Sequence, residues 1–268
     1  MTATDTALKS ASTALGAGTI IARSLKLFFR NFLRIAVLGL VPMVGLQVAG
    51  AWVAGVILQA IGPANDTASV GVVIVYLFFA LGAFGLVVAT ITLFAYDTLE
   101  RSPRPLWAYI VRGLRFIVPI LALSVFCGIL IYIGTAFFVV PGLWLAAVFS
   151  MVFPAIVVEG TGLTAVGRSA RLTKGYRWPI IGTLLVMGFI TGLMVLGVAA
   201  FLGLFISGVE NAVGGGAWLL NTGLALLVGS FLYAISFGLP AVTTALIYAR
   251  LREIKEGTSI ADITEVFA

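Results

Sequence analysis

The chain has 268 residues, of which 61% are hydrophobic and 10% charged, and its formal net charge is +6 at pH 7. A soluble domain is about 25% charged, so this composition excludes an ordinary soluble protein and is typical of a membrane protein. Histidine is absent and Cys127 is the single cysteine. The commonest general base and metal ligand is therefore missing, and no intramolecular disulfide can form. We expect no catalytic residue, no metal and no cofactor.

The basic residues are gathered in a few places. All sixteen lie in four clusters, which are Lys9 to Arg34, Arg101 to Arg115, Arg168 to Arg177 and Arg250 to Lys255. Long stretches without any charge separate these clusters, as in a polytopic membrane protein whose basic links all lie on one side. Basic residues beside spans set orientation and meet anionic lipid headgroups. We therefore expect membrane lipids as partners, and no nucleic acid.

A membrane-spanning helix needs about 20 apolar residues. Six segments satisfy this requirement: residues 35–60, 69–97, 117–139, 142–158, 178–207 and 217–249. Pro141 and Gly142 predict a tight turn between the third and fourth spans. Splitting the last segment in two would move Arg250 and its neighbours to the other side, so one long helix is the simpler interpretation. The fold class is thus all-α with six spans, in the cell (inner) membrane, with both termini cytoplasmic.

The links also carry helical patterns. Residues 19–34, 104–116 and 162–175 predict amphipathic helices at the cytoplasmic interface. In the first, Ile21, Leu25, Phe28 and Phe32 share an apolar face. One membrane domain then covers residues 14–252, between a disordered tail at 1–13 and a cytoplasmic tail at 253–268. This order predicts a unit of one interfacial helix and a span pair that is used three times.

Two span exits support such a repeat. Residues 89–99 and 241–251 match at Ala89 and Ala241, Thr92 and Thr244, Tyr96 and Tyr248, and Leu99 and Leu251. Tyr96 and Tyr248 also fit the aromatic belt at a membrane interface, as does Trp107. Gly85 and Ala89, and Gly188 and Gly192, are small residues at the four-residue spacing that lets helices pack closely.

The charged residues at the span ends have two interpretations. Asp97, Glu100 and Glu159 could do acid–base work, but interfacial ion pairs with Arg101, Arg112 or Arg168 are the more ordinary role. The candidates for contact with lipid headgroups are the basic residues of the three amphipathic links. They are Arg23, Lys26, Arg30, Arg34, Arg112, Arg115, Arg168, Arg171 and Lys174.

Two motifs resemble a known family. Glu159 ends a span, the run Arg168-Ser169-Ala170-Arg171-Leu172-Thr173-Lys174-Gly175 follows, and the last span closes on Tyr248, Leu251 and Arg252. This pattern resembles the membrane domain of some glycerophosphoryl diester phosphodiesterases and the related stand-alone bacterial membrane proteins. The resemblance implies a membrane domain alone, since the catalytic barrel with its histidines and metal-binding carboxylates is absent from these residues. Ala249 also replaces an acidic residue that is often found in that family.

Two classes of function remain. The first is a non-enzymatic membrane module, which acts as a scaffold or as a lipid-interacting or membrane-organising accessory. The second is a transporter or flippase-like protein for a lipid or an uncharged or amphipathic solute. A membrane enzyme comes third, because the middles of the spans contain no Asp, Glu, Lys, Arg or His.

Overall fold

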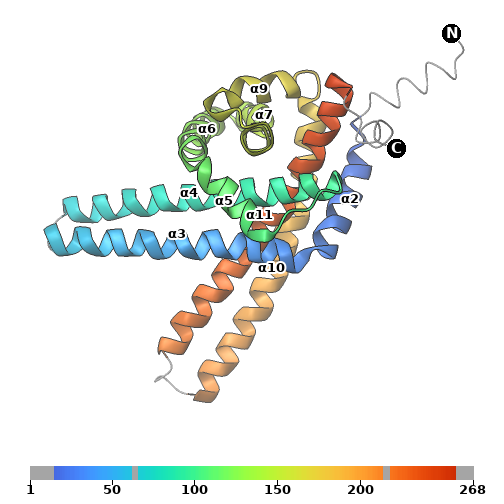
Figure 1. Ribbon diagram of the computed structural model, residues 1–268. Helices are drawn as coiled ribbons and strands as arrows, with labels where there is room; N and C mark the ends of the chain where they lie inside the picture. Colours follow the sequence, from blue (N-terminus) through green and yellow to red (C-terminus); the bar gives the residue numbers. More distant parts are fainter. Residues whose placement is uncertain (1–14, 62–65, 214–217, 258–268) are drawn as a thin grey trace, which may run out of the picture.

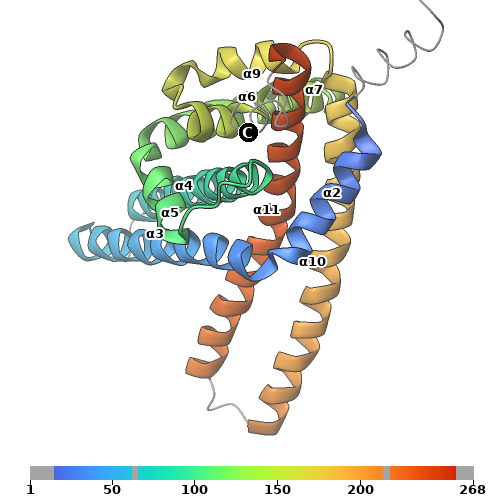
Figure 2. The same cartoon turned by 45° about the vertical axis from the view of Figure 1, so that its right-hand side comes forward.

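The protein consists of helical hairpins that meet at one end. The computed structural model describes residues 15–61, 66–213 and 218–257, and these are helical with no strand among them. The hairpins pair α3 (Phe32–Ile61) with α4 (Asp66–Leu99), α6 (Ile117–Phe137) with α7 (Val139–Phe149), and α10 (Arg177–Val213) with α11 (Trp218–Glu256). They leave the centre in three different directions (Figures 1 and 2).

Shorter helices connect the hairpins. They are α2 (Ala17–Arg30), α5 (Leu106–Arg115), α8 (Val152–Pro154), the π-helix η1 (Ala155–Glu159), the 3-10 turn η2 (Gly162–Thr164) and α9 (Ala165–Thr173). All of them lie near the end where the hairpins join, which we call the junction (Figure 2).

Among the residues that the structure describes, five segments are long and apolar enough to cross a membrane. They are Phe32–Gln59, Val70–Leu99, Ile117–Phe137, Val139–Glu159 and Arg177–Leu204. Three of these have 28 to 30 residues, which exceeds the roughly 20 that a straight crossing needs and leaves room for tilt. The sixth predicted span falls in α11, where many of the side chains lie outside the described residues.

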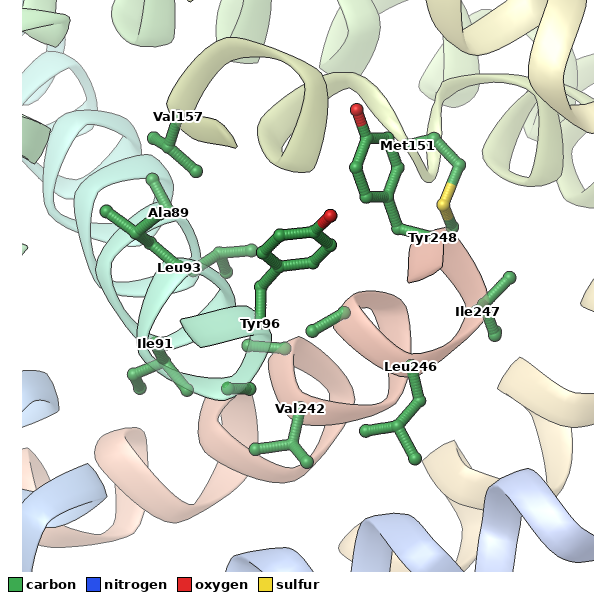
Figure 3. Packing of buried hydrophobic residues seen from close by; sticks show 14 of the residues in the cluster. Ala89, Ile91, Leu93, Tyr96, Met151, Val157, Val242, Leu246, Ile247 and Tyr248 are labelled. Atoms are coloured by element: carbon green, nitrogen blue, oxygen red, sulfur yellow. The ribbon is translucent and has the colours of Figure 1, made fainter. Parts of the chain in front are cut away.

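The core of the protein sits at the junction. It combines Ala83–Tyr96 of α4, Met151–Val157 of the fourth predicted span and Leu239–Leu251 of α11. Figure 3 shows these three segments facing one another. Away from the junction the hairpins expose large apolar side chains, such as Trp52, Phe189 and Phe137. Such exposure would be costly in water and is favourable in lipid.

The first amphipathic helix differs from its prediction. α2 ends at Arg30, and α3 begins at Phe32 after a turn at Asn31, so Arg34 belongs to α3. The apolar side of α2 packs against α10 and α11, with Phe28 only 1% exposed. This helix therefore covers protein, whereas the sequence pattern placed its apolar face in the acyl boundary. Both environments are apolar, so the amphipathic pattern alone does not distinguish them.

The second amphipathic helix keeps its apolar face free. In α5, Trp107, Val111 and Leu114 are exposed, while Tyr109 and Gly113 are buried against the core. Gly113 is required there, because a Cβ at this position would lie 2.6 Å from a methyl carbon of Leu86. The exposed face of α5 is thus available to the membrane surface.

The predicted turn at Pro141–Gly142 is wrong. The chain turns at Phe138, whose backbone is extended, and Pro141 lies in the first turn of α7. Proline is tolerated there because N–H groups of the first turn have no intrahelical partner. Gly142 instead packs on α6, where an added Cβ would lie 2.8 Å from the Cα of Thr135.

Candidate functional site

Four charged side chains form a closed ring at the junction. Arg168 of α9 and Arg252 of α11 each pair with both Glu159, at the end of η1, and Glu256 of α11. Arg168 binds Glu159 in bidentate fashion, with Nε 2.9 Å from Oε2 and Nη2 2.8 Å from Oε1. Arg252 Nε lies 3.1 Å from Glu256 and 3.7 Å from Glu159. Because two cations alternate with two anions, the ring is neutral as a whole.

Two tyrosines extend this ring to α4. The Tyr248 hydroxyl donates to Glu159, and Arg252 Nη1 donates to the Tyr96 hydroxyl at 2.7 Å. The two aromatic rings meet edge to face with centroids 6.0 Å apart, and Figure 3 shows them between α4 and α11. We call the six residues Tyr96, Glu159, Arg168, Tyr248, Arg252 and Glu256 the junction cluster. It ties α4, η1 and α11 to α9.

The ion pairs of the junction cluster stabilise the charged form of Arg168. Hydrogen bonding to Glu159 raises the pKa of the Arg168 guanidinium above its usual value, although burial acts in the opposite direction. The side chains of both residues are about one-fifth exposed. Charge-assisted bidentate pairs of this kind are strong and directional. The cluster therefore fixes a geometry, and its carboxylates are occupied by arginine.

A second contact attaches α11 to α9. Lys255 Nζ donates to the carbonyl groups of Arg171 and Lys174, at 2.7 and 2.8 Å. These carbonyls belong to the end of α9, where helical acceptors lack partners and a cation is favourable. Gly175 follows in the left-handed region with φ 89°, which a glycine adopts without strain.

The fourth predicted span is interrupted, and Ser169 fills the break. Pro154 has no N–H for the carbonyl of Ser150 four residues earlier, and the helix loses its regular course at Ser150 and Met151. The Ser169 hydroxyl donates to the Val148 carbonyl at 2.5 Å and accepts from the Met151 N–H at 3.2 Å. One buried hydroxyl thus satisfies two backbone groups that the break would leave without partners.

A separate contact forms where α4 ends. Arg104 Nε lies 3.1 Å from Oδ2 of the buried Asp97, and the Arg104 N–H donates to the Tyr109 hydroxyl. Burial raises the pKa of that phenol. Arg112 Nε donates to the Val157 carbonyl at 2.7 Å. Among the carboxylates considered in the sequence analysis, only Glu159 takes a predicted partner, Arg168. Asp97 pairs with Arg104, which was not among the predicted partners.

The structure divides the predicted headgroup contacts into two groups. Arg168 and Arg112 are engaged inside the protein, with carboxylates and with backbone carbonyls respectively. Seven others have exposed side chains, and these are Arg23, Lys26, Arg30, Arg34, Arg115, Arg171 and Lys174. They belong to α2, the start of α3, α5 and the end of α9, and Figure 1 shows these helices near the junction, from which the hairpins extend away.

The residues of the family-like motifs come together. Glu159, Arg168, Tyr248 and Arg252 form most of the junction cluster. Leu172, Thr173 and Leu251 are buried beside it. The aromatic-belt interpretation is wrong for Tyr96 and Tyr248, which are 6% and 0% exposed inside the protein. The hydroxyl groups of both tyrosines meet charged partners that lie far away in the sequence, so the local pattern could not identify them.

A cavity lies on the apolar side of the junction cluster. Its volume is about 290 Å³, and α4, α6, the interrupted fourth span, α10 and α11 all contribute to its wall. One phenylalanine from each hairpin converges there, since the ring of Phe84 is 6.0 Å from that of Phe153 and 4.9 Å from that of Phe237. The arrangement can hold an apolar group at the point where the hairpins diverge.

Within the described ranges, no group of acidic, cysteine or histidine side chains could hold a metal ion. Comparisons with protein-family models, with curated proteins and with solved structures found no match to this chain. What the structure establishes is therefore an all-helical protein whose long apolar helices are those of a membrane protein.

Proposed function

We propose that this chain is a non-enzymatic, lipid-interacting module of the cell membrane, with six spans and both termini in the cytoplasm. The observation that carries the proposal is the distribution of charge. The exposed basic side chains among the headgroup candidates belong to α2, the start of α3, α5 and the end of α9, which lie near the junction, and the charge-free parts of the hairpins extend away from it (Figure 1). Basic residues beside spans face the cytoplasm and attract anionic headgroups. A relationship to the phosphodiesterase-associated membrane domains is part of this proposal, supported by the motif residues of the junction cluster.

The pairing of the carboxylates in the junction cluster argues against catalysis. The carboxylates of the junction cluster are occupied by Arg168 and Arg252, so neither Glu159 nor Glu256 is placed to exchange a proton with a substrate. A general base needs a free carboxylate or imidazole within hydrogen-bond reach of its substrate. The role that fits such paired charges is to hold the hairpins in one arrangement.

The topology is tested with reporter fusions after residues 66, 140, 212 and 268. We expect external signals at the first three positions and a cytoplasmic signal at the last, because every basic link then stays inside. An external signal at residue 268 would overturn the six-span topology.

The lipid interaction is tested with the full-length protein in vesicles. Phosphatidylcholine is mixed with rising amounts of phosphatidylglycerol, and the lipids that remain bound are counted by native mass spectrometry. We expect phosphatidylglycerol to be enriched, and replacement of Arg23, Arg30 and Arg34 by Gln to reduce this enrichment more at low salt than at high salt. Equal retention of both lipids by the wild-type protein would contradict the proposal.

A second candidate function is movement of a lipid or an uncharged or amphipathic solute across the membrane. The cavity where the hairpins diverge favours it. The test is the loss of fluorescence of a labelled lipid in sealed proteoliposomes when a membrane-impermeant quencher is added. Loss beyond the outer-leaflet half would support this candidate over the scaffold.

A further inference from the structure

The cavity beside the junction cluster is lined by apolar atoms and satisfied hydroxyl groups. Ser124 donates to the Ile120 carbonyl, Ser150 to the Ala147 carbonyl and Thr244 to the Ala241 carbonyl, at 2.7 to 2.9 Å. A hydroxyl has one proton to donate, and each of these protons is already used. No charged side chain lines the cavity. The thiol of Cys127 is the remaining donor among the side chains that line the cavity, and it is a weak one. A polar ligand would therefore lose its hydration and gain little in exchange.

The position of the cavity indicates which molecule reaches it. Most of its wall belongs to apolar segments that are long enough to cross a membrane, and α11 supplies the rest. Thr244 at its edge stands one helical turn before Tyr248 of the junction cluster, so the cavity lies just on the apolar side of the polar boundary. At that depth a bilayer supplies hydrocarbon chains.

The volume fits part of such a chain. An apolar cavity of about 150 Å³ can hold benzene, and this one is about 290 Å³. It therefore has room for a segment of several methylene groups, and not for a whole lipid. The edge-to-face rings of Phe84, Phe153 and Phe237 provide the aromatic surface against which a chain would pack.

We propose that this cavity is a binding site for one hydrocarbon segment of a membrane lipid acyl chain, held between the three hairpins. The inference rests on the proposed membrane-lipid function and adds that the tail is recognised at a defined site. It predicts specific, saturable occupancy, in contrast to the unsaturable contact of bulk lipid with the outer surfaces of the helices.

Gly128 provides a way to fill the cavity. It lines the wall, and a Cβ added there would meet no heavy atom within 4 Å. Gly128→Leu should therefore occupy the space without a clash. Gly188 of α10 has equally open surroundings and does not line the cavity, so Gly188→Leu is a matched control. Gly128→Ala fills less of the space and should have an intermediate effect.

The experiment uses the full chain in phosphatidylcholine vesicles that contain a phospholipid with a photoactivatable group near the end of one acyl chain. After irradiation, adducts are located by mass spectrometry. We expect adducts on Phe84, Cys127 or Phe153 that saturate as the probe fraction rises. Each displaced methylene costs roughly fourfold in affinity, so Gly128→Leu should reduce these adducts about tenfold or more. Adducts on the exposed Ile129 and Phe189 should rise linearly with the probe fraction. Their yield should be the same in the wild-type protein and in Gly128→Leu.

Two results would overturn the proposed acyl-chain site. Absence of saturable adducts on the cavity wall in the wild-type protein overturns the proposal, as does an undiminished yield in a folded Gly128→Leu variant. Should Gly128→Leu fail to fold, the wild-type saturation curve and Gly128→Ala decide. Because the vesicles contain no anionic lipid, the result is independent of headgroup preference. A negative labelling result therefore does not contradict the proposed interaction with anionic headgroups. Likewise, a failed headgroup experiment does not contradict the acyl-chain site.

Discussion

Removing Arg168 should loosen the junction more than removing any exposed basic residue. Loss of one partner from a fully buried ion pair costs about 3–5 kcal/mol, whereas exposed pairs contribute about 0–1 kcal/mol. The Arg168 side chain is 22% exposed and meets two carboxylates, Glu159 and Glu256. We therefore expect Arg168→Ala to cost about 2–3 kcal/mol, because both carboxylates would then share Arg252 alone.

The assay is thermal unfolding of the purified protein in one detergent, followed by tryptophan fluorescence. For a chain of this size, 1 kcal/mol shifts Tm by roughly 2–4 °C, so a loss of about 2–3 kcal/mol should lower Tm by about 4–12 °C. Arg168→Lys should recover less than half of the loss, since lysine keeps the charge but cannot form the bidentate pair. The control is Arg171→Ala on the same helix, where the side chain is exposed and Tm should hardly move.

A double-mutant cycle isolates the pair. Glu159→Gln and Arg168→Met are measured alone and together, and the coupling between them should exceed about 1 kcal/mol, because contacting residues in one network are not additive. Equal Tm values for Arg168→Ala and Arg171→Ala, or a coupling near zero, would refute the view that the ring fixes the hairpins.

Two further predictions concern neutral residues. Ser169→Ala should destabilise the protein by about 1–3 kcal/mol, because it leaves two buried backbone groups unpaired, and a thermal melt beside the exposed control Thr164→Ala measures it. Gly142→Ala should lower Tm since the new methyl would press on the backbone of Thr135. Gly182→Ala, which meets no atom within 4 Å, should leave Tm unchanged or raise it; an equal loss in both variants would contradict the close packing of α6 on α7.

Local sequence patterns predicted most of the helices. Where the structure differs from the prediction, contacts between segments that are distant in the sequence are the main cause. The apolar runs between basic clusters correctly located five candidate spans, because a run of 18 or more uncharged apolar residues is typical of a membrane-spanning helix. The break at Ser150 follows from Pro154 by a local rule and could have been predicted. The hydrogen bond from Ser169 to the broken segment could not have been predicted, because the position of Ser169 depends on how α9 folds back over the interrupted span.

The junction cluster shows the same limit. Glu159 and Arg168 are nine residues apart, and their pairing was among the predicted alternatives. Tyr96 and Arg252 are 156 residues apart and meet only because α4 crosses α11. The spacing of small residues was equally ambiguous. A Cβ added at Gly85 would lie 2.5 Å from a methyl carbon of Ile120 in α6, whereas one added at Gly188 would meet no heavy atom within 4 Å. The threefold repeat and the sixth span stay predictions.

The junction cluster and the cavity depend on the same two segments. α11 contributes Pro240 to the cavity wall and Tyr248 to the cluster, two turns further on, and the interrupted fourth span contributes Phe153 and then Glu159. Because these backbones are shared, the ion pairs that fix the cluster also fix the separation of the cavity walls. Loss of Arg168 should therefore weaken saturable acyl-chain labelling although the side chain does not line the cavity. Labelling that survives Arg168→Ala at full strength would mean that helix packing alone shapes the cavity.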